Sequence, residues 1–185
     1  MIELKERGIL IFSKISSENN LYLKFLTQKD EIITGISFGG STKKKKNIFQ
    51  IGYFLNIVIK NKNKNFPNSI SAELSKPYYH NIFIDKYKLH ALLTLVSLLN
   101  ISIIEGQKVS GLFNLSENII EILANEKKWI INYFIFLLNL LKIIGYDIDY
   151  QNNNSKDYLN LDSLQFSNLS ITTVSYTHLR AHETS

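Results

Sequence analysis

The spacing of apolar residues changes near residue 80, and this change limits the folds that are open to the chain. Before it, short apolar runs alternate with polar segments, as in strands that are joined by turns. After it, residues 86–99, 109–124 and 126–144 place apolar side chains at helical spacing. We therefore predict an α+β chain, in which a small closed or sandwiched β domain comes first and an all-α part follows.

Five strands are predicted before this change. Each is a short run of mostly apolar residues, and several runs alternate so that one face would be buried. The expected strands span residues 3–15, 21–27, 32–38, 48–60 and 70–74. Residues 28–31 and 61–65 are polar, as expected of turns. Gly145 stands where the cap of the last helix belongs.

The connection between the third and fourth predicted strands carries four consecutive lysines: Lys43, Lys44, Lys45 and Lys46. Paired glycines, Gly39 and Gly40, come just before them and permit backbone angles that other side chains forbid. Adjacent ammonium groups repel one another, so they stay solvated unless a polyanion neutralises them. The connection is therefore either a solvated hairpin loop or a phosphate-contacting loop on a small β-barrel.

Positive charge is concentrated where the strands are predicted. Residues 1–76 hold 13 lysines and arginines against six acidic residues, whereas residues 77–173 hold seven against nine. This asymmetry is expected if one domain meets a polyanion and the other does not. Further lysines lie at the next connection along the chain. The predicted DNA-binding residues are Lys43, Lys44, Lys45, Lys46, Lys60, Lys62 and Lys64.

Three aromatic residues, Phe38, Phe49 and Tyr53, lie near these lysines in the sequence. Rings beside phosphate-neutralising lysines are what a groove for a single nucleic-acid strand needs, because bases stack on them. The alternative for Phe49 and Tyr53 is packing in the core, and we expect it for at least one of the two.

The sequence carries no pattern of a catalytic or metal site. It contains no cysteine, which excludes disulfides and cysteine-ligated zinc within the chain and suits a reducing compartment. His80 and His90 lack partners at ligand spacing and are expected on the surface. The glycine pair lacks the spacing of a phosphate-binding loop, and no Ser–His–acid set can be assigned. We predict no enzyme, no cofactor and no metal.

The segment 126–144 is the most apolar of the predicted helices, and a membrane span is its rival interpretation. Its uninterrupted apolar stretches are shorter than the ~20 residues that a bilayer requires. Asn132, Asn139 and Lys142 also interrupt them. We therefore predict a buried core helix without membrane contact. The charged start of the chain lacks a signal-peptide apolar region, so we expect a cytoplasmic, nucleoid-associated protein.

The composition changes abruptly after Thr173. Up to that residue the chain favours Lys, Asn and Ile, whereas residues 174–185 contain none of the three. This tail looks like the conceptual translation of a transposon-type sequencing adapter, so we exclude it from the interpretation of fold and function. The same interpretation implies that the natural protein was cut short near Thr173. It also makes the ligand-like spacing of His178 and His182 accidental.

Several short motifs follow one another in a particular order. They are Gly8-Ile9-Leu10, Leu26-Thr27, Gly35 through Gly39-Gly40 into the basic run closed by Gln50, Glu73-Leu74, and Leu140-Leu141-Lys142-Ile143-Ile144-Gly145-Tyr146. In this combination the chain resembles the RecO family of bacterial recombinational repair proteins over about residues 1–160. It looks closest to the alphaproteobacterial members, in which paired glycines precede the basic stretch.

The resemblance implies an N-terminal OB-fold and a helical C-terminal domain. We accordingly expect an OB-fold DNA-binding domain over residues 1–79, an incomplete helical domain over 80–173 and a non-native tail over 174–185. Members of the family bind single- and double-stranded DNA, anneal complementary strands and need no nucleotide. They engage RecR and the acidic C-terminal tail of single-stranded-DNA-binding protein, and so help to load RecA.

The family's basic stretch corresponds to residues 43–46 here, whereas its tail-binding pocket cannot be assigned to particular residues. Many relatives carry a cysteine zinc site shortly after the helix that ends in Gly-Tyr. Residues 151–154, Gln-Asn-Asn-Asn, occupy that region in this chain, and no cysteine follows. This departure argues against structural zinc.

We therefore expect a non-enzymatic mediator of DNA repair and recombination that binds DNA and promotes strand annealing. One alternative is a protein–protein adaptor whose helical domain binds a repair partner while the lysines only keep it soluble. Another is an OB-type RNA-binding protein. A DNA affinity that depends on salt would distinguish the DNA-binding mediator from the adaptor. A comparison of the affinities for DNA and RNA strands of equal length would test the RNA-binding alternative.

Overall fold

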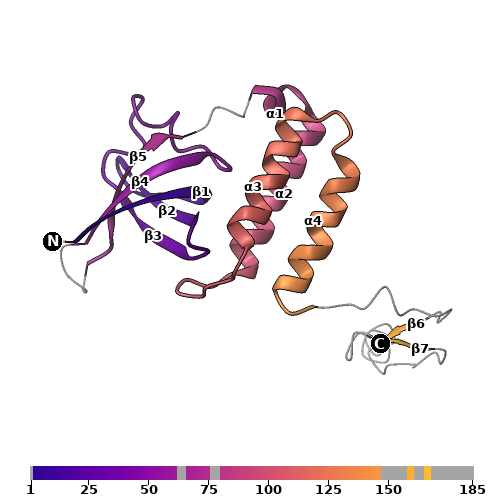
Figure 1. Cartoon of the computed structure of the whole chain (residues 1–185). Coiled ribbons are helices and arrows are strands. Elements are labelled where there is room, and N and C mark those ends of the chain that lie inside the picture. Colours follow the sequence, from indigo (N-terminus) through magenta and orange to yellow (C-terminus); the bar gives the residue numbers. More distant parts are fainter. Residues whose placement is uncertain (1, 62–65, 76–79, 147–157, 161–164, 168–185) are drawn as a thin grey trace, which may run out of the picture. The chain divides into compact units, whose positions relative to one another are not determined.

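The chain begins with five strands that close into a barrel (Figure 1). The computed structural model describes residues 2–61, 66–75, 80–146, 158–160 and 165–167. The strands are β1 (Ile2–Ser17), β2 (Asn20–Thr27), β3 (Ile32–Ser37), β4 (Phe54–Asn61) and β5 (Ser69–Leu74). They are paired in the order β1-β2-β3-β5-β4, and β4 pairs with β1 to complete the ring. Neighbouring strands are antiparallel except β3 and β5, which run parallel.

Alternation along the strands builds the interior of the barrel, since every second side chain points inward. The buried residues of this cluster are Leu10, Leu21, Leu23, Phe25, Phe49, Leu55, Ile57, Ile59 and Ile70. The barrel closes where Ile36 of β3 lies opposite Ser69 of β5. A Cβ at the neighbouring Gly35 would lie 2.6 Å from the carbonyl oxygen of Asn68. Glycine is therefore required for the two strands to approach this closely.

Four helices follow the barrel in the described part of the chain. They are α1 (His80–Ile84), α2 (Lys86–Ser102), α3 (Leu112–Asn125) and α4 (Ile130–Ile143). The carboxylate of Asp85 caps α2 by accepting hydrogen bonds from the backbone N–H groups of Tyr87 and Lys88. Gly145, with φ of 100°, follows the end of α4 as predicted for a helix cap. In Figure 1, α2 and α3 lie next to the strands and α4 lies farther from them.

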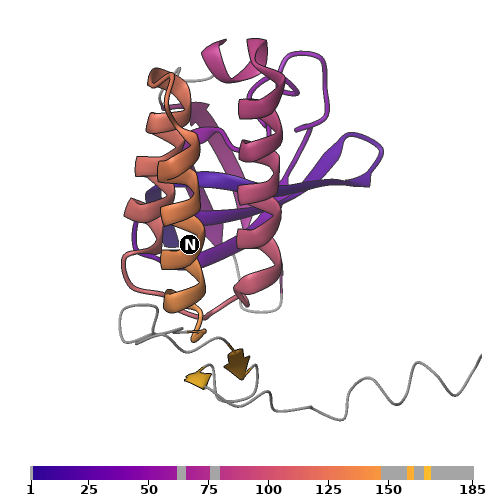
Figure 2. The ribbon, with the colours of Figure 1, turned by 90° about the vertical axis from the view of Figure 1, so that its right-hand side faces the viewer.

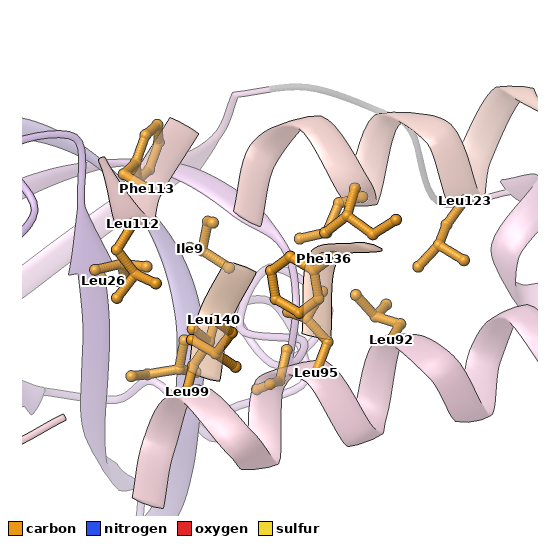
Figure 3. Close-up of a cluster of buried hydrophobic side chains, with 14 of the residues drawn as sticks. Ile9, Leu26, Leu92, Leu95, Leu99, Leu112, Phe113, Leu123, Phe136 and Leu140 are labelled. Carbon is orange, nitrogen blue, oxygen red and sulfur yellow. The ribbon is translucent and has the colours of Figure 1, made fainter. Parts of the chain in front are cut away.

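The helices share a second hydrophobic core with the outside of the barrel. Ile9, Ile11, Leu26, Ile32 and Phe54 belong to one cluster with buried residues of all four helices, and each is at most 3% exposed. Figure 3 shows two of them, Ile9 and Leu26, among leucines of α2, α3 and α4. Burial of each such side chain stabilises the fold by roughly 1.5–3 kcal/mol. The middle of β1 and the end of β2 consequently carry buried apolar residues on both faces of the sheet.

Asp30, in the turn between β2 and β3, joins the barrel to the start of α3. Its carboxylate accepts hydrogen bonds from the backbone N–H groups of Gly111 and Phe113, both at 2.8 Å. Gly111 is the N-cap residue of α3 and offers no capping side chain of its own. The barrel thus satisfies the free N–H groups at the start of a helix that is distant in sequence.

Arg7 makes a second joint between the barrel and α3. Its guanidinium forms an ion pair with Glu117 of α3. The same group lies 5.1 Å from the ring centroid of Phe54 and 5.6 Å from that of Phe113. The cation therefore bridges one aromatic ring from a strand and one from a helix, where it gains cation–π attraction in addition to the ion pair.

The predicted fold class, an OB-type barrel followed by helices, is confirmed. Two local predictions were wrong. β4 begins at Phe54 and not at residue 48, because Phe49 is buried in the barrel and the N–H of Tyr53 donates to the carbonyl of Gln50 in a turn. The short helix α1 was not predicted, since Ile82 is its only buried residue and leaves no helical period to detect.

α4 packs in the core as the sequence predicts, but through one face only. Its buried residues are Tyr133, Phe136 and Leu140. Its exposed large apolar residues are Ile130, Ile131, Phe134, Ile135, Leu138 and Leu141. The helix therefore packs along one face only. Within the described residues, no helix has the length and apolar character needed to cross a membrane.

Residues Met1–Ile144 form one compact unit, and Gly145–Ser185 form a second. The second unit contains a small antiparallel sheet of β6 (Tyr158–Asn160) and β7 (Gln165–Ser167), which the sequence does not predict. The domain limits expected after residues 79 and 173 stay predictions. The adapter-like tail, residues 174–185, lies outside the described residues.

The cap that Asp30 provides can be tested by substitution. Asp30→Gly removes both carboxylate hydrogen bonds. Glycine adopts the backbone angle of this position, φ 62°, without strain. We expect the free energy of unfolding, measured in urea, to fall by about 1–2 kcal/mol. Gln28→Gly adds the same backbone freedom at an exposed position of the same turn and should cost less. Equal losses in both variants would contradict the cap.

Candidate nucleic-acid interface

The lysine loop, residues 38–53, connects β3 to β4 through successive tight turns. The N–H groups of Lys45 and Lys46 donate to the carbonyl of Thr42 at 3.0 and 2.8 Å. The hydroxyl of Thr42 in turn donates to the carbonyl of Gly39 at 2.8 Å. Local backbone bonds therefore hold the four lysines in a defined turn.

Two hydrogen bonds tie this loop to the tip of the β1–β2 hairpin. The N–H of Gly39 donates to the side-chain oxygen of Asn20 at 3.0 Å, and the N–H of Ser41 donates to the carbonyl of Asn19 at 3.1 Å. Gly39 has φ of 67°, which glycine adopts without strain. The β1–β2 hairpin extends past the helices in Figure 2. The loop and the hairpin tip thus form one continuous surface.

The four lysines of the loop, Lys43, Lys44, Lys45 and Lys46, are all exposed. The ammonium of Lys45 donates to the carbonyl of Phe38 at 3.3 Å. None of the four forms an ion pair with an acidic residue of the described part of the chain. Their charges are therefore available to an external anion.

The three aromatic residues near the lysines have different surroundings. Phe49 is 6% exposed and packs inside the barrel, so the expectation that at least one ring lies in the core is confirmed. Tyr53 is half-buried, its ring centroid lies 6.1 Å from that of Phe83, and burial raises the pKa of its hydroxyl. Phe38 is 59% exposed beside the lysines. Phe38 is the most exposed of these three rings.

The strand register connects Lys60 to the base of the lysine loop. Five residues, one from each strand, are paired in succession around the barrel: Lys14, Tyr22, Ile36, Ser69 and Lys60. We call them the outer row, because chain neighbours of Tyr22, Lys60 and Ser69 belong to the barrel core: Leu21, Leu23, Ile59 and Ile70. Lys14 and Ile36 lie on the same side of the sheet as Tyr22, since paired residues share a face. Ile36 is two residues before Phe38, where the lysine loop begins. The row therefore runs from Lys60 to the hairpin that holds the loop.

Lys60 also forms an ion pair with Glu3, at 3.4 Å between the ammonium nitrogen and a carboxylate oxygen. Both side chains are 43% exposed, so this pair contributes little to stability and leaves Lys60 in contact with solvent. Lys62 and Lys64 lie outside the described residues. Phosphate contact by any of the seven lysines stays a prediction.

The residues predicted from the sequence to bind DNA do not include Lys14, Phe12 or Tyr22. Lys14 is exposed, and the rings of Phe12 and Tyr22 pack edge-to-face with centroids 6.3 Å apart on the outer surface. Alternation in residues 21–27 could have placed Tyr22 opposite the buried Leu21 and Leu23. The pairing of Tyr22 with Lys14 depends on the hairpin register, which the sequence pattern alone does not give.

The helices cover the neighbouring part of this outer surface. Lys24 of β2 donates to the carbonyls of Asn100 and Ile103 at the end of α2, at 3.0 and 3.2 Å. Burial lowers the pKa of Lys24, and the nearby Glu105 carboxylate partly offsets this shift. Thr34 of β3 donates to the Glu105 carboxylate at 2.6 Å. Lys24 and Thr34 therefore bind the end of α2 and the segment that follows it. The outer-row residues Tyr22 and Ile36 are two positions away on the same strands.

Other polar sites offer less to a ligand. A groove of about 670 Å³ on the outer surface of β1, β4 and β5 is lined by both cations and carboxylates, among them Lys5 and Glu73. The described residues contain no group of three or more His, Asp or Glu side chains that could hold a metal ion. His80 and His90 are exposed as predicted, and His178 and His182 lie outside the described residues.

Comparison with known proteins identifies relatives of both parts of the chain. Residues 85–156 match the family model described as "Recombination protein O C terminal". The DNA repair protein RecO of Rickettsia bellii is 27% identical over 149 residues, which is 80% of this chain. The predicted resemblance to the RecO family is confirmed. The RecO proteins of Rickettsia canadensis and Rickettsia akari match at 26% and 27% identity over 148 residues, again 80% of this chain.

The match with these RecO proteins covers 61–62% of their length, so the chain spans less than two thirds of the relatives. A match of 149 residues in a chain of 185 must include strands of the barrel as well as helices. The chain is therefore similar to DNA repair proteins of the RecO type over most of its length. The activities and partners of the full-length RecO proteins are therefore only proposed for this chain.

Two phenylalanines of the lysine loop should respond oppositely to truncation. Phe49→Ala opens a cavity in the barrel core and should lower the free energy of unfolding by about 3–5 kcal/mol. Phe38→Ala, at an exposed position of the same loop, should change it by no more than about 0.5 kcal/mol. Urea denaturation of both variants provides the measurement. A stable Phe49→Ala protein would show that Phe49 does not anchor the loop.

Proposed function

We propose that this chain is a RecO-type recombination mediator that binds single- and double-stranded DNA through the lysine loop. The observation that carries the proposal is the loop itself. Four exposed cations stand on a fixed turn, without an acidic partner in the described part of the chain. The excess of positive charge over residues 1–76 and the resemblance to RecO proteins support the same function.

The proposed mechanism is electrostatic. Lysines that neutralise phosphates on two complementary strands lower the repulsion that opposes pairing, while base pairing itself supplies the sequence specificity. This would promote strand annealing without nucleotide hydrolysis. By resemblance to the family, the partners would be RecR and the C-terminal tail of single-stranded-DNA-binding protein, and the outcome would be loading of RecA.

A protein–protein adaptor is the second candidate function. The observation that favours it is the exposed side of α4, on which six large apolar residues lie on one helix instead of singly over the surface. On this alternative the lysine loop would not contact DNA, and DNA affinity would be weak and insensitive to changes in the loop.

Charge reversal of the lysine loop separates the two functions. If the loop contacts phosphates, changing its four lysines to Glu should weaken binding to every DNA sequence by a similar factor. The slope of log affinity against log salt should flatten by roughly 0.7 for each lost single-strand contact. The measurement is titration of one labelled oligonucleotide at several salt concentrations.

The matched control changes four exposed lysines of the helical part to Glu: Lys86, Lys108, Lys127 and Lys128. Both variants undergo the same change in net charge, so a general charge effect would alter both equally. Circular dichroism checks that each variant is folded. A loop variant that keeps the wild-type slope would exclude the lysine loop as the DNA contact.

The proposed mediator should need neither a nucleotide nor a metal ion. We expect the purified protein to anneal complementary strands equally well with and without a chelator, and to show no DNA-stimulated ATP hydrolysis. The physical reason is that charge neutralisation requires only the lysines. Annealing that is lost on chelation, or ATP turnover by the pure protein, would refute this prediction.

A further inference from the structure

We propose that the exposed side of α4 is the contact surface for a second copy of this chain. We call this surface the α4 stripe. Its residues are Ile130, Ile131, Phe134, Ile135, Leu138 and Leu141, which are between 37% and 73% exposed. The dimer is independent of the proposed function, because it involves the helical part of the chain and not the lysine loop. The spacing of the stripe, its lack of charge and its exposed area all support it.

The stripe lies on the side of α4 opposite to its packed face. With about 100° between successive residues, the six side chains fall within roughly 140° of the helix circumference. The buried residues Tyr133, Phe136 and Leu140 fall on the other side. Positions 131, 134, 138 and 141 also follow the alternating three- and four-residue spacing by which one helix packs along another. A helix that is apolar on two opposite sides is suited to two partners, and within the described residues only one side is covered.

The lack of charge on the stripe indicates which partner fits it. Residues 129–141 contain no Lys, Arg, Asp or Glu, and their polar side chains other than Tyr133 are the neutral amides of Asn132 and Asn139. A charged partner, DNA included, would find no opposite charge there, and its own charges would lose water without compensation. A second stripe is apolar and neutral in the same way. Two copies therefore meet the condition of an isologous contact, in which the same patch on both subunits fits itself.

The exposed area of the stripe is sufficient for a specific contact. The exposed fractions of its side chains correspond to about three whole side chains, which at ~180 Å² each gives roughly 1,100 Å² for two copies. A specific protein interface needs about 1,000 Å² in total. Packing of Tyr133, Phe136 and Leu140 already orders the helix, so association would cost little conformational entropy.

A contact through the α4 stripe leaves the lysine loop uncovered. α4 lies on the side of the helices away from the strands (Figures 1 and 2), whereas the loop connects two strands of the barrel. A dimer of this kind would carry two lysine loops on one particle. Two DNA strands that are bound to the two copies would then be held at a raised effective concentration for pairing.

The experiment measures the mass of the full chain in solution by sedimentation equilibrium, without DNA. We expect the wild type to pass from the 21.4 kDa monomer to twice that mass as its concentration rises. Ile131→Glu and Leu138→Glu each place a charge in the contact and should weaken self-association at least about tenfold. Ile15→Glu is the matched control, because Ile15 is a 66% exposed isoleucine of the barrel, and it should associate like the wild type. Each copy has a net charge of +5, so salt should strengthen the dimer, whereas it weakens DNA binding.

A second measurement does not depend on the folding of the charged variants. The chain has no cysteine, so Ile135→Cys and Ile15→Cys each introduce a single thiol. Mild oxidation should join two copies through position 135, near the middle of the stripe, and not through position 15.

A wild type that stays monomeric up to ~100 μM would overturn the dimer and leave the stripe to another protein, as the adaptor alternative requires. Equal association of the Ile131→Glu, Leu138→Glu and Ile15→Glu variants, or equal cross-linking through positions 135 and 15, would also overturn it. Because no DNA is present, each of these results would leave the proposed DNA binding unaffected.

Discussion

The burial of one part of the barrel's outer surface by the helices determines the rest of this structure. Ile9, Ile11, Leu26, Ile32 and Phe54 all point away from the barrel interior, yet none is more than 3% exposed. A one-residue slip of β1 or β2 would exchange this set with the side chains of the barrel core, so packing on both faces fixes the register of these strands. The same register brings one residue from each strand into the outer row. The position of each of these five residues on the outside of the barrel is therefore a consequence of how the strands and helices pack.

Polar contacts at the edges of this interface divide the outer surface between structure and ligand. Asp30 and Arg7 bind the start and side of α3, and Lys24 binds the end of α2. These groups are partly buried and already partnered, so a nucleic acid would have to break existing contacts to use them. The lysines of the loop, by contrast, carry charge that is uncompensated in the described part of the chain. Positive residues in the same domain thus differ in whether they already have a protein partner, and a count of charge over residues 1–76 cannot show this difference.

The sequence predicted what depends on local patterns and missed what depends on distant contacts. Alternating and helical spacing correctly located four strands and the three long helices, because an element with one buried face has apolar residues at a regular spacing. β4 was predicted to begin too early in the chain. Ile48 and Phe49 are apolar because they pack against the barrel core, but they do not belong to the strand. α4 was expected to be a core helix because its composition is apolar, but composition does not reveal how many of its side chains are buried. The outer row depends on the parallel pairing of Ile36 with Ser69, and no pattern within either strand indicates that pairing.

The order of the lysine loop comes from groups other than its lysine charges. Thr42, Gly39 and Asn20 hold the turn through backbone and neutral side-chain hydrogen bonds, and Phe49 anchors its end in the barrel. Four neighbouring ammonium groups repel one another, and this repulsion opposes the turn unless solvent or an anion screens it. A bound phosphate chain would relieve the repulsion without having to create the loop conformation, so little ordering entropy would oppose binding. A preformed basic turn of this kind can release one strand and accept another at low conformational cost, which is the property that annealing two strands on one surface requires.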